Sequence, residues 1–139
     1  MLIKKFDHYY VLRLHKNDEI ITALKKAAEN QKINGAFFFG LGVGSSVVLG
    51  YFDVDQRTYI KKVFEGEYEF TSFIGNISTY SGDIIVHCHV TITNRDFDAV
   101  GGHLVQATVP ATCEIVIFPF TGILKRKKDR DTNLPVLDV

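Results

Sequence analysis

Only residues 17–35 of this chain space their apolar side chains with the period of a helix, and most of the remainder has the pattern of strands and turns. Asn17-Asp18-Glu19 offers a capping side chain followed by acids, which predicts a helix start. Asn34-Gly35 predicts the end of the helix, because glycine adopts the left-handed conformation at low cost. A single amphipathic helix buries its apolar face best against a sheet, so we expect an α+β fold.

The segments expected to form that sheet are rich in β-branched and aromatic residues. They span residues 8–14, 36–39, 45–54, 58–64, 68–80, 84–93 and 109–118. Short turns such as Ser81-Gly82-Asp83 join successive segments, which favours antiparallel pairing. Gly40, Gly42 and Gly44 predict a turn or bulge, not a nucleotide-binding loop, because a strand and not a helix follows them. The predicted fold is a largely antiparallel β-sheet with one main α-helix packed on it.

Three consecutive phenylalanines, Phe37, Phe38 and Phe39, lie in one expected strand. Neighbouring side chains of a strand point to opposite faces, so these rings cannot all enter one core. At least one face beyond the core therefore needs cover, and a subunit interface would provide it.

Composition sets the class of protein. The 139 residues suit a single domain, for which we expect a compact core at about 1–122 and a C-terminal tail at about 123–139. Lys and Arg number 16, as do Asp and Glu, so the chain lacks the positive excess typical of proteins that bind DNA by bulk electrostatics. Two cysteines are too few for a disulfide scaffold. With no expected leader or membrane segment, we predict a cytoplasmic protein.

The tail contains a basic run, residues 125–131, with five bases and two acids. Its candidate nucleic-acid contacts are Lys125, Arg126, Lys127, Lys128 and Arg130, since a basic segment can contact phosphates. In a trimer, the phosphate contacts of three such tails would add if the tails converged on one face. The alternative, which we favour, is a solvated tail that aids solubility.

Three of the five histidines form a candidate metal site. His87 and His89 are two residues apart in an expected strand, so their side chains leave the same face while Cys88 points the other way. His103 follows the pair Gly101-Gly102, which permits a sharp turn or a close backbone approach that could bring it beside the other two.

Three imidazoles on a divalent metal, with a fourth position open, are a common catalytic zinc arrangement. Glu69 is the candidate general base for such a site, and Asp96, Asp98 or Glu69 could orient an imidazole. The alternative is a polar histidine cluster satisfied by backbone groups and water.

Several short motifs, taken in order, resemble the plants-and-prokaryotes-conserved (PPC) domain family. These motifs are Gly40-Leu41-Gly42, the segments 49–53 and 69–77, His87-Cys88-His89, Gly101-Gly102-His103-Leu104 and the segment 113–117. The resemblance covers residues 1 to about 122, and the combination of the two histidine motifs is its most specific part.

The resemblance implies a compact α+β domain that assembles as a homotrimer. It also implies that His87, His89 and His103 cluster and can hold a metal ion. We expect a divalent metal there, and zinc before others, because three imidazoles are a common zinc ligand set. Plant members carry AT-hook DNA-binding motifs and associate with transcription factors, whereas prokaryotic members are usually the domain alone and are often described as candidate DNA-binding proteins. This chain has no Arg-Gly-Arg-Pro core, so the DNA-binding element of the plant proteins is missing.

Three functions follow as hypotheses. The leading one is a non-enzymatic homotrimeric module that binds DNA, regulatory proteins or small ligands and carries a metal-capable histidine site. The second is a zinc-type metalloenzyme that uses a metal-bound water at His87, His89 and His103, with Glu69 as base. The third is a DNA-binding protein that uses its basic tail.

Overall fold

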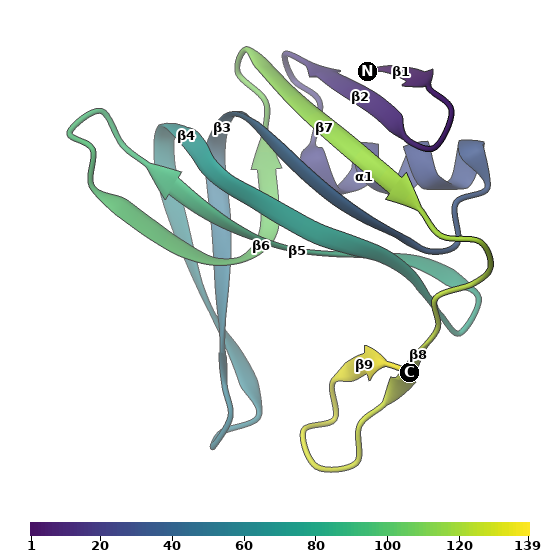
Figure 1. The fold of residues 1–139 in the computed structure, drawn as a ribbon. Helices are drawn as coiled ribbons and strands as arrows, with labels where there is room; N and C mark the ends of the chain where they lie inside the picture. The colour runs from purple at the N-terminus through teal and green to yellow at the C-terminus, as the bar shows by residue number, and fades with distance from the viewer.

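The structure of this chain is a computed structural model that describes residues 1–139. It contains nine strands and one helix, shown in Figure 1. In chain order they are β1 (Leu2–Lys5), β2 (Tyr10–His15), α1 (Ile20–Gln31), β3 (Ala36–Asp53), β4 (Thr58–Tyr80), β5 (Asp83–Thr93), β6 (Ala99–Thr108), β7 (Thr112–Pro119), β8 (Arg126–Lys128) and β9 (Pro135–Leu137).

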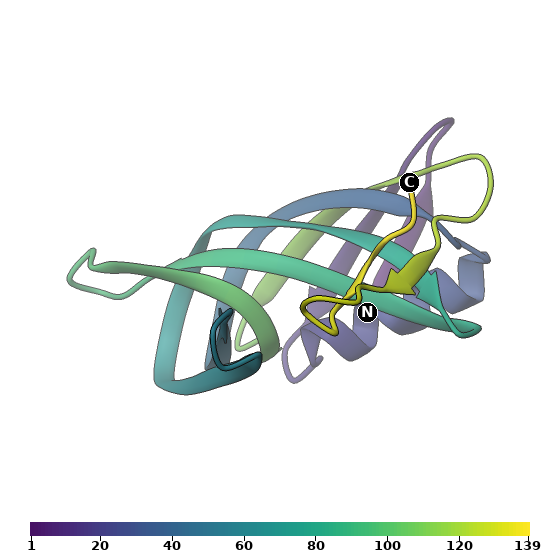
Figure 2. The same cartoon turned by 90° about the horizontal axis from the view of Figure 1, so that it is seen from below.

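Seven strands form one sheet in the order β1-β2-β7-β3-β4-β5-β6, and each neighbouring pair is antiparallel. The long strand β3 changes partner along its length. Its first part pairs with β7, and its second part pairs with β6. Because β6 also pairs with β5, strands β3, β4, β5 and β6 close on one another, and the sheet curves strongly (Figures 1 and 2).

The helix covers one face of the sheet, where it packs against β5 and β6. Its buried residues recur at helical spacing and meet the inward side chains of the strands in a single core. The predicted α+β class, with a mostly antiparallel sheet and one helix, is confirmed. At 12 residues, α1 falls short of the length that a membrane-crossing helix requires.

The helix ends differ from the sequence expectation by a few residues. Glu19, not Asn17, is the N-cap, and its carboxylate accepts hydrogen bonds from the backbone N–H groups of Ile21 and Thr22. The helix ends at Gln31, and Lys32 adopts the left-handed conformation that we assigned to Gly35. The backbone N–H of Lys32 caps the last carbonyls, so a local hydrogen bond stabilises a conformation usually left to glycine.

The expected break at the glycines is a bulge inside one continuous strand. The pairing register of β3 and β4 shifts between Gly40 and Gly42 and again between Ser45 and Val47. Gly42 has φ of +148° there, and Gly44 leaves room for the ring of Phe70. Of the two readings that the sequence allowed, turn or bulge, the structure has the bulge.

The C-terminal segment is not a free solvated tail. Strands β8 and β9 pair with each other as a small hairpin, which we call the C-terminal hairpin. The backbone N–H of Thr79 donates to the carbonyl of Leu124 at 2.8 Å, which ties the start of this segment to the end of β4. Residues 134–137 are apolar and half-buried, and burial of their apolar surface stabilises the packing of this segment on the sheet. The basic run before them had favoured a solvated tail instead.

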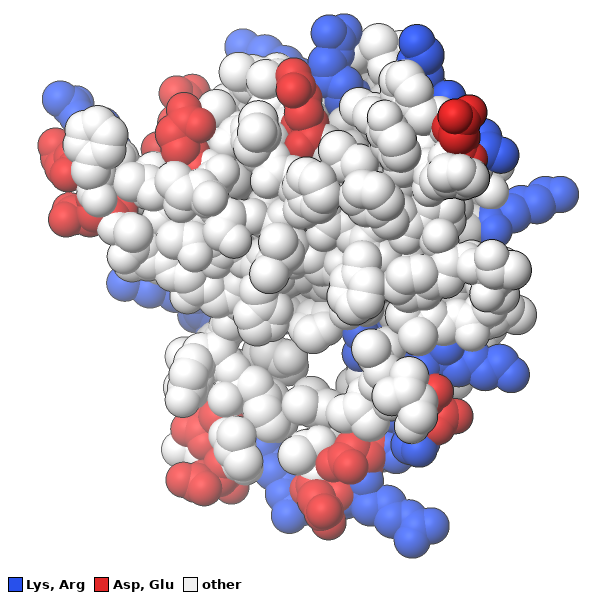
Figure 3. Space-filling model, viewed as in Figure 1, with Lys and Arg blue, Asp and Glu red and all other residues white.

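The sheet face opposite α1 is apolar and exposed. Phe38 points into the core and is 2% exposed, whereas Phe37 and Phe39 are 54% and 51% exposed on the outer face. Ile74 lies opposite Phe39 and Phe118 lies opposite Phe37, so all four exposed side chains share this face. We call these four residues the aromatic face. Figure 3 shows that charged residues gather at the margins of this side of the molecule and leave its centre uncharged.

Candidate metal centre

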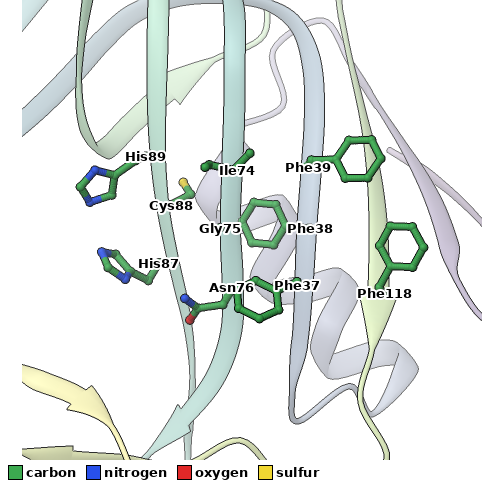
Figure 4. Close-up of a pocket in the computed structure, with 10 residues that line it drawn as sticks. All are labelled: Phe37, Phe38, Phe39, Ile74, Gly75, Asn76, His87, Cys88, His89 and Phe118. Carbon is green, nitrogen blue, oxygen red and sulfur yellow. The ribbon is translucent and has the colours of Figure 1, made fainter.

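Strand register brings the three histidines together. His89 on β5 lies directly opposite His103 on β6, and directly opposed residues of an antiparallel pair share a face. His87 is two residues earlier on β5 and therefore points to the same side. Figure 4 shows His87 and His89 projecting together from β5, while Cys88 leaves the strand on the other side. The sequence prediction that these three side chains cluster is confirmed.

The glycine pair before His103 acts by close approach, not by a turn. Gly101 and Gly102 lie inside β6, where Gly102 pairs with Val90 of β5. A Cβ atom on Gly102 would lie 3.1 Å from the carbonyl oxygen of Gly50, and one on Gly101 would lie 3.0 Å from that of Val90. The two glycines thus fit β6 closely between its neighbours, and this packing sets the position of His103.

The imidazoles are close enough to share one ion. One nitrogen from each of His87, His89 and His103 lies within 4.8 Å of the others, and the ring centroids are 5.0 to 5.5 Å apart. Ligand nitrogens around a tetrahedral zinc ion are about 3.4 Å apart. Small side-chain rotations would therefore close the site.

Two of the three rings are held in the neutral form that binds metal. Burial, followed by the nearby His103, Arg126 and His89, lowers the pKa of His87 to about 4. Burial and the charges around it also lower the pKa of His103. The Nδ1 atom of His103 is buried without a hydrogen-bond partner, which leaves a polar atom free for a ligand. The donor set and this unpartnered nitrogen both fit a metal ion.

Arg126 belongs to the site, although the sequence predicted it only as a candidate nucleic-acid contact. The C-terminal hairpin directs the Arg126 guanidinium toward the histidines. Its Nη2 donates to Oδ1 of Asn76 at 2.8 Å and lies 3.3 Å from Nδ1 of His87. Its Nε donates to the fully buried Ser78 hydroxyl at 2.7 Å, and Nη1 donates to the carbonyl of Pro135. No local motif signals these long-range contacts.

A pocket of about 720 Å³ opens beside the histidines, between the sheet and the C-terminal hairpin. Figure 3 shows the corresponding hollow below the uncharged centre of the molecule. The floor includes His87 and His103, and the ring of Tyr59 lies 5.5 Å from that of His103. A smaller pocket on the other side of His87 leads onto the aromatic face (Figure 4). The histidine cluster therefore borders both a cavity and the exposed apolar surface.

Glu69, the candidate general base, is not brought to the histidines. It lies opposite Thr93, four residues along β5 from His89, which corresponds to about 13 Å along the strand. No Asp or Glu belongs to the histidine cluster or lines either pocket. Within one chain, the cluster has no adjacent carboxylate.

The other candidate residues are spread over the surface and core. Lys125, Lys127, Lys128 and Arg130 are exposed on the C-terminal hairpin and its flanks, and Lys127 forms an ion pair with Asp138 at 2.7 Å. Cys88 and Cys113 are free and buried, and burial raises the pKa of each thiol to about 12. Neither thiol is a nucleophile under ordinary conditions.

Comparison with protein families gives one match across most of the chain. The model of the Plants and Prokaryotes Conserved (PCC) domain matches residues 2–121. The chain belongs to this family. The PPC resemblance stated from the histidine and glycine motifs is thereby confirmed. No curated protein is similar enough to count as a match.

Solved structures of the same architecture come from bacteria and archaea. A Bacteroides thetaiotaomicron protein named as a "putative DNA binding protein" has 26% identity and a TM-score of 0.95, with 99% of this chain and 96% of that chain covered. A Pyrococcus horikoshii PPC protein has 26% identity and a TM-score of 0.88, with 99% and 94% covered. A protein from Archaeoglobus fulgidus named as metal-containing has 28% identity and a TM-score of 0.88, and both chains are covered completely.

Proposed function

We propose that this PPC domain is a homotrimeric binding module in which His87, His89 and His103 hold one divalent metal ion. The observation that carries the proposal is the set of three imidazole nitrogens within 4.8 Å of one another. The name of the Archaeoglobus relative, a metal-containing protein, supports it.

Zinc is the ion we propose. Imidazole nitrogens suit zinc and other late first-row metals, whereas magnesium and calcium prefer oxygen ligands, which this cluster lacks. We also keep the cytoplasm as the proposed compartment, because Cys88 and Cys113 are both free thiols.

The homotrimer is proposed from the aromatic face. Phe37, Phe39, Ile74 and Phe118 are each at least 40% exposed on one continuous surface. Contiguous apolar surface of this kind marks an interaction site. Additional copies of the chain would cover it, and the histidine cluster at its edge would then lie next to the subunit contact.

Calorimetric titration of zinc into metal-free protein tests the metal site. The parent chain should bind about one zinc ion per subunit, and His103→Ala should weaken binding at least about 100-fold, more than the loss of an outer-shell partner typically causes. His8→Ala is the matched control, because His8 is exposed and lies outside the cluster. Equal affinities for the parent and His103→Ala would refute the three-histidine site.

A metalloenzyme remains the second candidate, because three protein ligands leave a coordination position open and the 720 Å³ pocket lies beside it. The candidate base Glu69 lies about 13 Å along the sheet from His89, and the pocket has no carboxylate of its own. General-base catalysis requires a group within hydrogen-bond reach of the water that it activates. We therefore favour the binding module.

DNA binding, suggested by the name of the Bacteroides relative, would use the exposed bases of the C-terminal segment. The test is fluorescence anisotropy with duplex DNA, comparing the parent with a chain in which Lys125, Lys127, Lys128 and Arg130 are all glutamine. Arg126 stays unchanged, because its side chain holds the hairpin to the sheet. The affinity of the parent for DNA should fall steeply as salt rises. In low salt, the quadruple variant should bind DNA at least about tenfold more weakly than the parent. Equal binding by the two chains would exclude these residues as the DNA contact.

A further inference from the structure

The pocket between the sheet and the C-terminal hairpin is positively charged and has no counter-charge. Its charged residues are Lys61 and Arg126, and none of the 13 residues that line it is Asp or Glu. Seven of the 13 are hydrophobic, so apolar surface surrounds the two cations. A pocket of about 720 Å³ is within the size range of small-molecule sites.

Arg126 is a half-buried cation without a carboxylate partner. Its hydrogen bonds go to the neutral groups of Ser78, Asn76, Pro135 and His87. The two ion pairs of the molecule lie elsewhere and do not include it. Removing a charge from water is costly unless an opposite charge compensates it. The fold thus keeps an unpaired positive charge at the wall of a cavity, although this lowers the stability of the folded state.

Lys61 adds a second positive charge on the same side of the sheet. Gly50 of β3 lies opposite Lys61 on one side and His103 on the other, so these three residues form one row on one face. Gly50 has no side chain to fill the middle of the row, and a Cβ there would lie 3.1 Å from the ring of Tyr59.

We propose that this pocket binds a small organic carboxylate with an apolar body. The carboxylate group sits beside Arg126 and Lys61, and the apolar part packs against Val105 and the half-buried residues 134–137 of the hairpin. This site goes beyond the proposed metal centre, because its charge comes from two side chains of the folded protein and does not depend on a bound ion.

The chemistry of Arg126 favours a single carboxylate over a larger anion. Four of its five N–H groups are already used in hydrogen bonds, so one remains to donate to a ligand. The aliphatic residues that line the pocket offer no side-chain donors to the further oxygens of a phosphate. They favour a ligand whose remaining surface is hydrocarbon.

The experiment uses metal-free full-length protein, in the presence of a chelator, and follows backbone amide shifts by nuclear magnetic resonance. The probes are hexanoate, its neutral analogue hexanamide, and inorganic phosphate. Hexanoate should shift the amides of His103, Val105 and Leu137 in a saturable manner, with an affinity at least about tenfold above that of either other probe, which is the effect of about 1.4 kcal/mol.

Charge-removing variants locate the site. Arg126→Gln should weaken hexanoate binding about tenfold or more, and Lys61→Gln about threefold, as expected for a more exposed charge. Lys62→Gln is the matched control, because Lys62 neighbours Lys61 but points to the other face and lies over the ring of Phe64. It should change the affinity by less than about twofold. If Arg126→Gln loosens the hairpin, Lys61→Gln still tests the charge.

Equal binding of hexanoate and hexanamide would overturn the proposal, as would shifts that avoid the pocket or an affinity unaffected by Lys61→Gln. Preference for inorganic phosphate over hexanoate would replace the carboxylate by a phosphate ligand and refute the proposed class. Because the measurement is made without metal, it can fail while the histidine centre stands, and the reverse also holds.

Discussion

A chain carrying Phe39→Asp should sediment as a monomer of 15.7 kDa, whereas the parent should sediment at three times that mass. The substitution puts a carboxylate at the centre of the aromatic face. Each copy in a trimer would have to bury that charge without a partner, which costs several kcal/mol per site in practice. The monomer itself tolerates the change, because Phe39 is 51% exposed within one chain.

Analytical ultracentrifugation of the parent, of Phe39→Asp and of Ile123→Asp makes the measurement. Ile123 is the matched control, because it is 59% exposed but lies in the connection between β7 and β8, off the sheet. The control should remain trimeric. A parent that sediments as a monomer would refute the homotrimer, and a trimeric Phe39→Asp would remove the aromatic face as its interface.

Gly75→Ala should lower the free energy of unfolding by about 3 kcal/mol or more, at the upper end of the usual cost of overpacking. A Cβ on Gly75 would lie 2.4 Å from the carbonyl oxygen of His87 and 2.5 Å from the ring of Phe38. It would also lie 2.6 Å from the Cβ of Cys88. The strand that carries His87 and His89 would have to move, so zinc affinity should fall together with stability.

Chemical denaturation of Gly75→Ala and of Gly82→Ala separates crowding from backbone strain. A Cβ on Gly82 meets nothing within 4 Å, but the residue has φ of +91°, so this control reports the cost of the backbone conformation alone. That cost should be about 1 kcal/mol. Equal losses of unfolding free energy in the two variants would show that close packing at Gly75 does not fix the position of β5.

The shared face of His87 and His89 could be predicted from the sequence, because their geometry is local. His87 and His89 share a face through the two-residue period of a strand, and that holds wherever the strand lies. The position of His103 required the pairing of β5 with β6, and the sequence did not predict β6 as a strand. Gly101-Gly102 was compatible with a turn or with a close approach of two strands. The pairing of β6 with its neighbours shows that the close approach is correct.

The inward position of Arg126 could not be predicted from the sequence. A run of Lys and Arg is typical of a solvated segment, and nothing in it distinguishes the one side chain that turns inward. The contacts of Arg126 with Ser78, Asn76 and His87 join residues 39 to 50 positions apart, and they depend on how the C-terminal hairpin docks. The distance of Glu69 from the cluster likewise follows from strand register, which short motifs do not specify.

The most direct test of the metal centre is the metal content of untagged protein purified without chelator, measured for the parent and for His103→Ala. We expect about one zinc ion per parent chain and almost none in the variant, with both chains folded to the same extent. A parent chain that holds no metal even after incubation with zinc, or a variant that retains it, would contradict the proposal that His87, His89 and His103 form a metal centre.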